Sequence, residues 1–363
     1  MKTAAQPRVL HVVPALFGTG GIVGGAERYA YELARHMAAR VPTRLVSFGA
    51  EDSTIQDGPL DVRVIGGAWH VRGQRTNPFA AAIVPEILKA DVVHCHQHHI
   101  LMSSTAAALC RMTGRRVFAT DLGGGGWDVS AYVSTDRWFH AHLHISEYSR
   151  HISHHADKPW ARVILGGVDT DKFSPDPSIR RSTRALFVGR LLPHKGVADL
   201  IAALPDTAPL DIVGPLNTTG FVESLKRQAS GKDISFHHGV ADRTLIEMYR
   251  RALCLVLPSV YRTPDGQHTD VPELLGQTLI EAMACATPVI CTRVASMPEI
   301  VEDGVSGFIV EPGDTAVLRS RLEWLAAHPS EACVMGLAGR KRVVARFQWP
   351  DVVERCLDAY RSA

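Results

Sequence analysis

Short apolar runs alternate with amphipathic, helix-length segments along nearly the whole chain of 363 residues. The first run, Arg8–Leu16, precedes a Gly-rich turn and then apolar side chains at helical spacing, at Ala26, Tyr29, Ala30, Leu33 and Met37. Such a pair is typical of a buried strand followed by the helix that returns the chain to the next parallel strand. The alternation therefore predicts an α/β fold.

The expected strands form two series that a polar segment separates. The first series comprises Arg8–Leu16, Arg44–Phe48, Val62–Ile65, Asp91–His94, Arg116–Thr120, His142–Ile145 and Arg162–Leu165. The second comprises Ala185–Val188, Leu210–Val213, Ile234–His237, Cys254–Leu257, Pro288–Thr292 and Gly307–Val310. Between them, Asp169–Arg184 is polar and contains two prolines, which marks a domain boundary. We expect two doubly wound domains, residues 1–170 and 171–346, that face a cleft, and a C-terminal helix over 347–363 for which crossing back to the first domain is one alternative.

Charge and cysteine content exclude several classes of protein. Lys and Arg number 39 against 37 Asp and Glu, a formal charge of +2. This balance lacks the basic stripe of a nucleic-acid-binding protein, so no nucleic acid is expected as a partner. The seven cysteines are scattered and never in C-x-x-C spacing, as in a protein of the reducing cytoplasm. The apolar N-terminal stretch is too short for a secretory signal or a membrane span, so we expect a cytoplasmic protein.

A glycine-rich segment, GTGGIVGGAER, lies where the first strand gives way to a helix. Gly24 and Gly25 would let backbone N–H groups approach an anion at the helix N-terminus. The segment is neither a Walker A motif nor a G-x-G-x-x-G turn. A flexible strand-to-helix loop is the alternative interpretation.

Two cations follow the first strand of the second series in FVGRLLPHKG. Arg190 comes directly after Gly189, and Lys195 precedes the next helix. At the carboxyl end of a strand, beside a helix N-terminus, this pair is suited to a diphosphate, with Arg190 as a bidentate donor and Lys195 as a point charge. Two solvated surface cations are the alternative.

Two glutamates lie eight residues apart in PELLGQTLIEAMACATPVI. Glu273 is in a Pro-bounded loop, and Glu281 is inside a helix that opens near Gly276. A mostly helical path of this length separates the backbones by up to about 12 Å, more than the roughly 5–5.5 Å between the carboxyls of a retaining glycosidase. The spacing favours recognition of hydroxyls at two places on an extended ligand, and solvated glutamates are the alternative.

These segments together resemble the family-4 retaining glycosyltransferases, which have the GT-B fold of two Rossmann-like domains. The resemblance rests on GGAER, VGRLLPHKG and E-x7-E with EAMACATPVI, and also takes in DVVHCHQ, ISEYSR, VDTDKFSP, LEWLAAHP and RFQWPDVVERCLDAY, in the family's order. It implies an N-terminal acceptor-binding domain and a C-terminal domain that binds a nucleotide sugar. The implied reaction transfers a hexosyl-type sugar from a UDP- or GDP-linked donor to a hydroxyl of a glycan or glycolipid, as in polysaccharide biosynthesis.

The resemblance also implies roles for individual residues. Arg190 and Lys195 would hold the diphosphate, Glu281 the ribose and Glu273 the transferred sugar. The backbone at Gly189 and the N–H groups of Leu275, Gly276 and Gln277 would add donor contacts, and the base would meet the backbone near His238, Gly239 and Val240. No metal or other cofactor is expected, because the two cations stabilise the leaving diphosphate.

The acceptor side departs from the family pattern. Asp121 stands where many members have a histidine, either as its replacement in catalysis or as the start of an Asx-type turn. In the dense run HCHQHH, we expect His96 or His98 near the acceptor; surface histidines and a shared metal ion at His94 and His96 are the alternatives.

Other interpretations of function and location stay open. A nucleotide-sugar 2-epimerase of the same fold and a catalytically silent glycan- or nucleotide-binding module are the two alternative functions. Family members with lipid-linked acceptors bind the inner membrane surface peripherally, and a helix with Arg28, Arg35 and Arg40 would contribute, although a solvated helix face explains these residues equally. The oligomeric state is not predicted.

Overall fold

The computed structural model describes residues 6–14, 25–123, 126–215 and 219–363. The chain divides into two units. Unit 1 is Met1–Gly167 with Trp349–Ala363, and unit 2 is Val168–Gln348. The chain thus leaves unit 1 near the expected boundary at residue 170, and the C-terminal helix belongs to unit 1.

Unit 1 contains one large sheet with the strand order β10-β9-β8-β7-β1-β2-β4-β3. Its strands are β1 (Val9–Val12), β2 (Thr43–Phe48), β3 (Ser53–Asp57), β4 (Leu60–Ile65), β7 (Val92–Cys95), β8 (Arg116–Ala119), β9 (Ala141–His144) and β10 (Ala161–Val163). Neighbouring strands are parallel except β3 and β4, which form an antiparallel edge. A small hairpin pairs β5 (Trp69–His70) with β6 (Pro78–Phe79).

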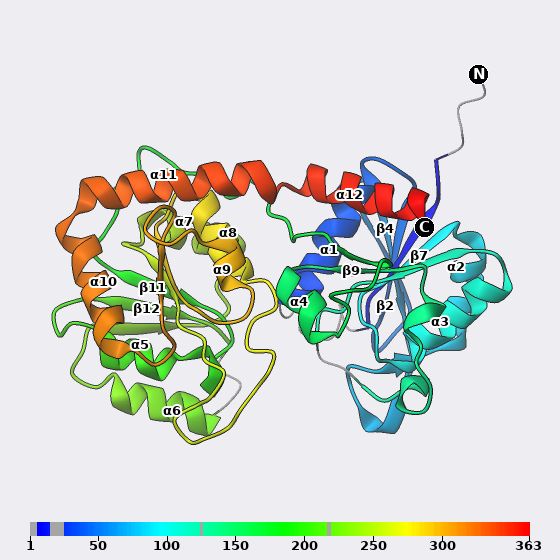
Figure 1. Ribbon diagram of the computed structural model, residues 1–363, viewed down its shortest axis with the longest axis horizontal. Helices are drawn as coiled ribbons and strands as arrows, with labels where there is room; N and C mark the ends of the chain where they lie inside the picture. The colour runs from blue at the N-terminus through cyan, green and yellow to red at the C-terminus, as the bar shows by residue number, and fades with distance from the viewer. Residues whose placement is uncertain (1–5, 15–24, 124–125, 216–218) are drawn as a thin grey trace. The chain divides into compact units, whose positions relative to one another are not determined.

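The helices of unit 1 cover this sheet and complete its core. They are α1 (Gly25–Ala38), α2 (Val84–Lys89), α3 (Leu101–Met112), α4 (Glu147–Ile152) and α12 (Trp349–Ser362). Helix α12 packs beside α1 (Figure 1). The indole of Trp349 requires Gly167 beneath it, because a Cβ at Gly167 would lie 2.5 Å from the ring.

Unit 2 contains a six-stranded, wholly parallel sheet with the order β13-β12-β11-β14-β15-β16. Its strands are β11 (Ala185–Val188), β12 (Leu210–Val213), β13 (Ile234–His237), β14 (Leu255–Leu257), β15 (Val289–Thr292) and β16 (Phe308–Val310). Its helices are α5 (Val197–Ala203), α6 (Thr219–Gln228), α7 (Asp242–Arg251), α8 (Gln277–Ala284), α9 (Met297–Ile300), α10 (Thr315–Ala327) and α11 (Pro329–Arg346). Figure 1 shows α5 and α6 on one side of this sheet and α8 and α11 on the other.

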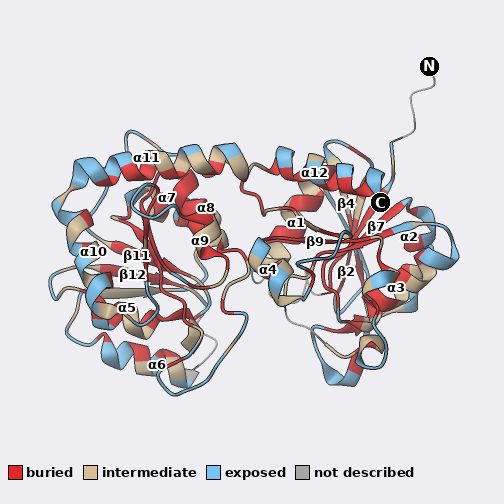
Figure 2. Ribbon diagram, viewed as in Figure 1, coloured by how far each residue is buried: buried red, intermediate tan, exposed pale blue. Residues whose placement is uncertain are grey.

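Each sheet has one point where the strand order reverses. In unit 1 it lies between β1 and β7, and in unit 2 between β11 and β14. Most strands of the two large sheets are buried, except the exposed edge strand β3, and the helices expose their outer faces (Figure 2). Ligands of doubly wound folds bind beyond the carboxyl ends of strands at such a reversal. The loops that follow β7, β11 and β14 are therefore where functional side chains are to be sought.

Candidate functional site

The loops after β11 and β14 are in contact in unit 2. The His194 carbonyl accepts a hydrogen bond of 2.8 Å from the Val260 amide. Gly196 has a φ of 67°, and a Cβ there would lie 1.9 Å from the Pro258 carbonyl oxygen. Only glycine satisfies both the left-handed backbone and this close approach. The glycine after Lys195 thus fixes how the lysine is presented to the β14 loop.

Lys195 is buried at the interface of these two loops, with 8% of its surface exposed. Its Nζ donates to Glu273 Oε2 at 2.7 Å and to the Pro272 carbonyl at 2.8 Å. Arg190, in contrast, is exposed. Burial is the main cause that lowers the pKa of His194, and the charges of Lys195 and Arg190 lower it further, against the opposing charge of Glu273.

Glu273 connects this lysine to the N-terminus of α8. While one carboxylate oxygen binds Lys195, the other accepts the Gly276 amide at 3.2 Å. Gly276 is the N-cap of α8 and has a φ of 77°. The Gly276 N–H that we expected to face the donor therefore binds Glu273 in this structure. Leu275 is buried, and Gln277 is the first residue of α8 and partly exposed.

Glu281 lies deeper, in the middle of α8, with 2% of its surface exposed. Its Oε2 accepts a hydrogen bond of 2.9 Å from the hydroxyl of Tyr249, which is fully buried in α7. Sequence reasoning missed Tyr249, because its only signal was an apolar position in a helical pattern. The ribose contact of Glu281 stays a prediction.

The other predicted donor residues are placed within their own units. His238 and Gly239 are exposed and Val240 is partly exposed, in the loop after β13, a strand that β12 separates from β11. Gly189 directly follows β11, and its amide donates to the Val213 carbonyl at 3.0 Å. In unit 1, Gly25 is the exposed first residue of α1, and Gly24 lies outside the described residues.

Of the acceptor residues predicted in unit 1, Asp121 lies in a turn and the two histidines are buried. Asp121 Oδ1 accepts the Gly123 amide at 3.0 Å, which is the Asx-type turn considered as one of its two interpretations. His96 and His98 are both buried, each with 2% of its surface exposed. The exposed imidazole of the run is that of His99, whose Nδ1 lies 3.0 Å from Ser130 Oγ. A contact of His96 or His98 with the acceptor stays a prediction.

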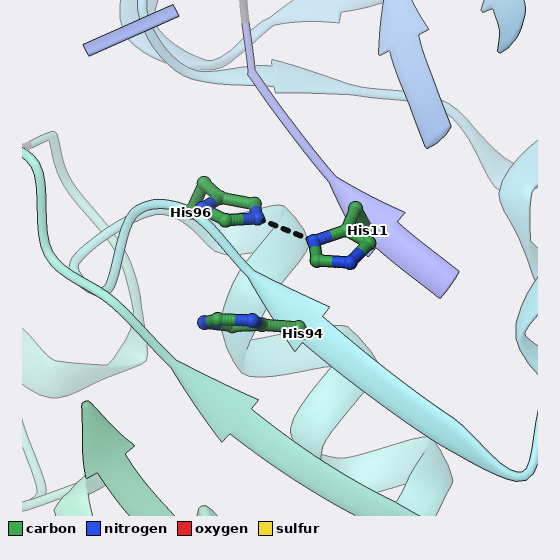
Figure 3. Close-up of side chains that lie close together, drawn as sticks. All are labelled: His11, His94 and His96. Carbon is green, nitrogen blue, oxygen red and sulfur yellow. Dashed lines mark hydrogen bonds between the residues drawn. The ribbon is translucent and has the colours of Figure 1, made fainter. Parts of the chain in front are cut away.

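The imidazoles of His11, His94 and His96 lie together where β1 and β7 end (Figure 3). His11 Nδ1 and His96 Nε2 are 2.7 Å apart, a hydrogen bond. His94 uses both nitrogens, at 2.7 Å from the Tyr360 hydroxyl and 2.8 Å from Thr120 Oγ1. Burial lowers the pKa of His11 to about 3 and those of the other two well below the usual range, so all three are neutral.

This cluster is better described as a core hydrogen-bond network than as a metal site. Two nitrogens bound to one zinc ion at 2.0–2.1 Å lie about 3.3 Å apart in a tetrahedron, farther than His11 Nδ1 and His96 Nε2. The rings of His94 and His96 are also stacked, with centroids 4.4 Å apart. The network ties Thr120, which precedes Asp121, to Tyr360 of α12.

Basic residues of α1 are paired within unit 1. Arg35 binds Glu32 of the same helix at 2.8 Å, and Arg40, just after α1, forms an ion pair with Glu354 of α12. Among the described residues no helix is long and apolar enough to cross a membrane.

Comparison with known protein families decides the assignment of the chain. The family model described as Glycosyltransferase Family 4 matches residues 23–172, and the one described as Glycosyl transferases group 1 matches residues 169–342. The chain belongs to the family-4 glycosyltransferases. The two matches fall almost entirely within unit 1 and unit 2 respectively.

Two relatives of this family-4 glycosyltransferase carry functional names. A GDP-mannose-dependent alpha-(1-6)-phosphatidylinositol monomannoside mannosyltransferase of Mycolicibacterium smegmatis is 34% identical over 56% of this chain and 58% of its own length. An alpha-maltose-1-phosphate synthase of Mycobacterium tuberculosis is 27% identical over 75% of this chain and 79% of its own. The chain thus spans little more than half of the first relative.

A solved structure supports the fold of this family-4 glycosyltransferase. The crystal structure of a glycosyltransferase from Rickettsia africae covers 98% of both chains with a TM-score of 0.74 and 19% identity. The expected GT-B architecture of two Rossmann-like units is confirmed.

Proposed function

We propose that this chain transfers a sugar, with retention of configuration, from a UDP- or GDP-linked donor to a hydroxyl of a glycan or glycolipid. The observation that carries the proposal is the pairing of Lys195 with Glu273 at the strand reversal of unit 2, where doubly wound folds bind nucleotides. The naming of one relative as GDP-mannose-dependent supports a GDP-linked sugar as the first donor to test.

The contacts of the Glu273 carboxylate with Lys195 and the Gly276 amide indicate how a donor would bind. Diphosphate oxygens compete with Glu273 for Lys195, and exposed Arg190 adds a bidentate contact. Displacement of Glu273 from Lys195 frees its Oε2 to bind a hydroxyl of the transferred sugar, while Oε1 keeps the Gly276 amide. Glu281 binds the ribose, and backbone near His238, Gly239 and Val240 meets the base.

The reaction that follows needs stabilisation of charge rather than a protein nucleophile. The bond from the anomeric carbon to the diphosphate oxygen breaks, and the acceptor oxygen bonds to the same face of that carbon. A leaving phosphate oxygen accepts the proton of the acceptor hydroxyl. Lys195 and Arg190 stabilise the charge that develops on the diphosphate, so no metal ion is required.

A donor screen followed by product analysis tests this function. Each of GDP-mannose, UDP-glucose and ADP-glucose is incubated with the protein, with and without glycan and phosphatidylinositol-type acceptors. We expect release of nucleoside diphosphate that depends on an acceptor, and a product with the donor's anomeric configuration. An isomerised sugar formed from donor alone would establish an epimerase instead, and binding of donor without turnover on any acceptor would establish a silent binding module.

A further inference from the structure

His99 is the exposed histidine of the loop that follows β7. Strand β7 lies at the reversal of the strand order in unit 1, and doubly wound folds bind ligands beyond the carboxyl ends of strands at such a point. The imidazoles of His96 and His98 in the same loop are buried. Of these three histidines, His99 is therefore the one that a ligand reaches without a change in the fold.

The hydrogen bonds behind His99 determine which of its ring nitrogens carries the proton. The carboxylate of Asp128 accepts from the hydroxyls of Ser104 and Ser130 and, at 2.9 Å, from the Ser130 amide. Since the single hydroxyl proton of Ser130 points to Asp128, Ser130 Oγ accepts from His99 Nδ1, 3.0 Å away. In the neutral imidazole the lone pair is then on Nε2.

Asp128 holds this arrangement from inside the fold. Only 1% of its surface is exposed, and its two carboxylate oxygens bind Ser104 of α3 and Ser130. The backbone adds a second link, because the His99 carbonyl accepts the Gly126 amide at 2.9 Å. The loops after β7 and β8 are thus fixed to each other. The imidazole of His99 is oriented before any ligand binds, as a binding site requires.

A partly exposed indole belongs to the same loop, at Trp127, the residue before Asp128. The Trp127 amide donates to Gln74 Oε1 at 3.0 Å, and its carbonyl accepts from Nδ2 of buried Asn77 at 2.7 Å. The ring of Tyr132, a residue that is 74% exposed, lies edge-on to the indole with centroids 6.1 Å apart. Polar side chains thus fix the backbone of an aromatic surface that the core does not cover.

Arg72 adds hydrogen-bond donors to this aromatic surface. Its guanidinium lies 4.2 Å from the centroid of the Trp127 ring, and the residue is exposed. The φ of Arg72 is 52°, in the left-handed region that non-glycine residues adopt at a cost and that is enriched at binding sites. A guanidinium stacked on an aromatic ring keeps the N–H groups in its plane available to oxygen acceptors.

We propose that His99, Trp127, Tyr132 and Arg72 form the acceptor subsite of unit 1 and that this subsite binds a pyranose sugar. His99 Nε2 accepts a hydrogen bond from one sugar hydroxyl, and Arg72 donates to others. The apolar C–H face of the sugar ring packs on Trp127 and Tyr132. The lone pair of His99, with the Asp128 carboxylate behind it, disfavours an anion and suits a neutral sugar. The inference rests on the proposed function, because it names a sugar as the acceptor of that transfer.

Sugar binding measured separately from transfer tests this subsite. Full-length wild-type protein, with and without saturating GDP, is applied to an immobilised array of mannose-, glucose- and galactose-containing glycans, and a glycan that binds is then titrated in solution. We expect the wild type to bind at least one of these glycans. A folded wild-type chain that binds none of them, with or without GDP, would overturn the proposal.

Variants of the two main contacts locate the bound sugar. His99→Phe keeps a ring but removes the lone pair, and Trp127→Ala removes the indole. Each should weaken glycan binding about fivefold or more and leave the affinity for GDP unchanged, because GDP is assigned to unit 2. His151→Gln, at an exposed histidine of α4, is the matched control and should bind the glycan as the wild type does.

The outcomes separate this inference from the proposed function. Wild-type glycan affinity in folded His99→Phe and Trp127→Ala would refute the subsite, even where the transfer reaction is observed. Glycan binding that both substitutions weaken, in a wild-type chain that transfers sugar from no donor, would support the subsite and refute only the transfer.

Discussion

The ammonium group of Lys195 lies 2.7 Å from the carboxylate of Glu273, although the loops that carry them follow different strands, β11 and β14. The side chains are only 10% and 17% exposed, so the pair is largely shielded from solvent. We assign Lys195 to the donor's diphosphate and Glu273 to its transferred sugar. In this structure the two side chains form an ion pair with each other. In the proposed donor complex, contacts with diphosphate and sugar replace the Lys195–Glu273 contact.

Glu273 and Glu281 should contribute to different steps. Glu281→Gln retains an acceptor for the Tyr249 hydroxyl but loses the charge, so affinity for free nucleoside diphosphate should fall by about 1–3 kcal/mol, the range for a charged hydrogen bond. Glu273→Gln should leave that affinity within a few-fold and lower kcat, because its contact with the sugar strengthens as charge develops at the anomeric carbon. A binding titration and a steady-state assay are compared for each variant. Equal losses of nucleotide affinity in both, or full turnover in Glu273→Gln, would contradict this division.

Turnover should survive removal of metal ions. In the proposed reaction Lys195 and Arg190 supply the positive charge for the leaving diphosphate, so no metal ion is needed there. The rate is measured at 25 °C before and after chelator treatment, with circular dichroism to confirm that the protein stays folded. Loss of turnover in the folded protein, restored by Mg²⁺ or Mn²⁺, would show that a metal takes part in the reaction.

The hydrogen bond between Tyr360 and His94 should stabilise the docking of α12. Tyr360→Phe keeps the ring against Phe118 but leaves buried His94 Nδ1 without this partner, which should lower the free energy of unfolding by about 1–3 kcal/mol. Tyr132→Phe, at a side chain that is 74% exposed, is the matched control and should change it by less than about 0.5 kcal/mol. Denaturant unfolding of both variants measures the difference. Equal free energies of unfolding in the two variants would show that the hydrogen bond between Tyr360 and His94 does not stabilise unit 1.

Glu86 should make the stability of unit 1 depend on acidity. Its side chain is 3% exposed and binds Arg44 and Arg63; burial by itself would raise the pKa of Glu86, but these guanidinium groups outweigh it and the pKa is lowered. A lowered pKa means that the stabilisation is present above the unfolded-state value, about 4.3, and is lost as the pH falls below it.

The variant Glu86→Gln isolates this contribution. It should be less stable than the wild type at pH 7 by about 1.5–3 kcal/mol, and the difference should shrink as the pH approaches 3. Urea unfolding at several pH values measures it. A difference that stays constant between pH 7 and pH 3 would show that the charge of Glu86 is not the cause.

The strand pattern predicted the parallel sheets because buried strands are continuously apolar, as in β11 and β14. It missed β3, Ser53–Asp57, which is mostly polar and lies at a sheet edge. Because this strand is mostly exposed, its sequence shows no continuous apolar run. The expected strand at Asp91 begins one residue later, at Val92, and the Asp91 carboxylate accepts a hydrogen bond from the Arg8 backbone amide.

The candidate site was predictable in part. Lys195 and Glu273 were each singled out from local motifs, but their contact depends on how two loops meet at a strand reversal, which no local spacing encodes. The burial of His96 and His98 was equally hidden, because a polar run next to a strand predicts exposure unless neighbouring elements supply partners. His98 finds such a partner in Thr135, thirty-seven residues away along the chain.

The most direct test of the central claim is the affinity for GDP and UDP in wild-type protein and in Lys195→Ala, Arg190→Ala and Lys341→Ala, measured by calorimetric titration. Lys341 is an exposed cation of α11 and serves as the control. We predict losses of about tenfold or more in the first two variants, as for charge-assisted hydrogen bonds to phosphate, and no change in the third. Unchanged affinity in folded Lys195→Ala and Arg190→Ala would contradict the assignment of the diphosphate to the loop after β11.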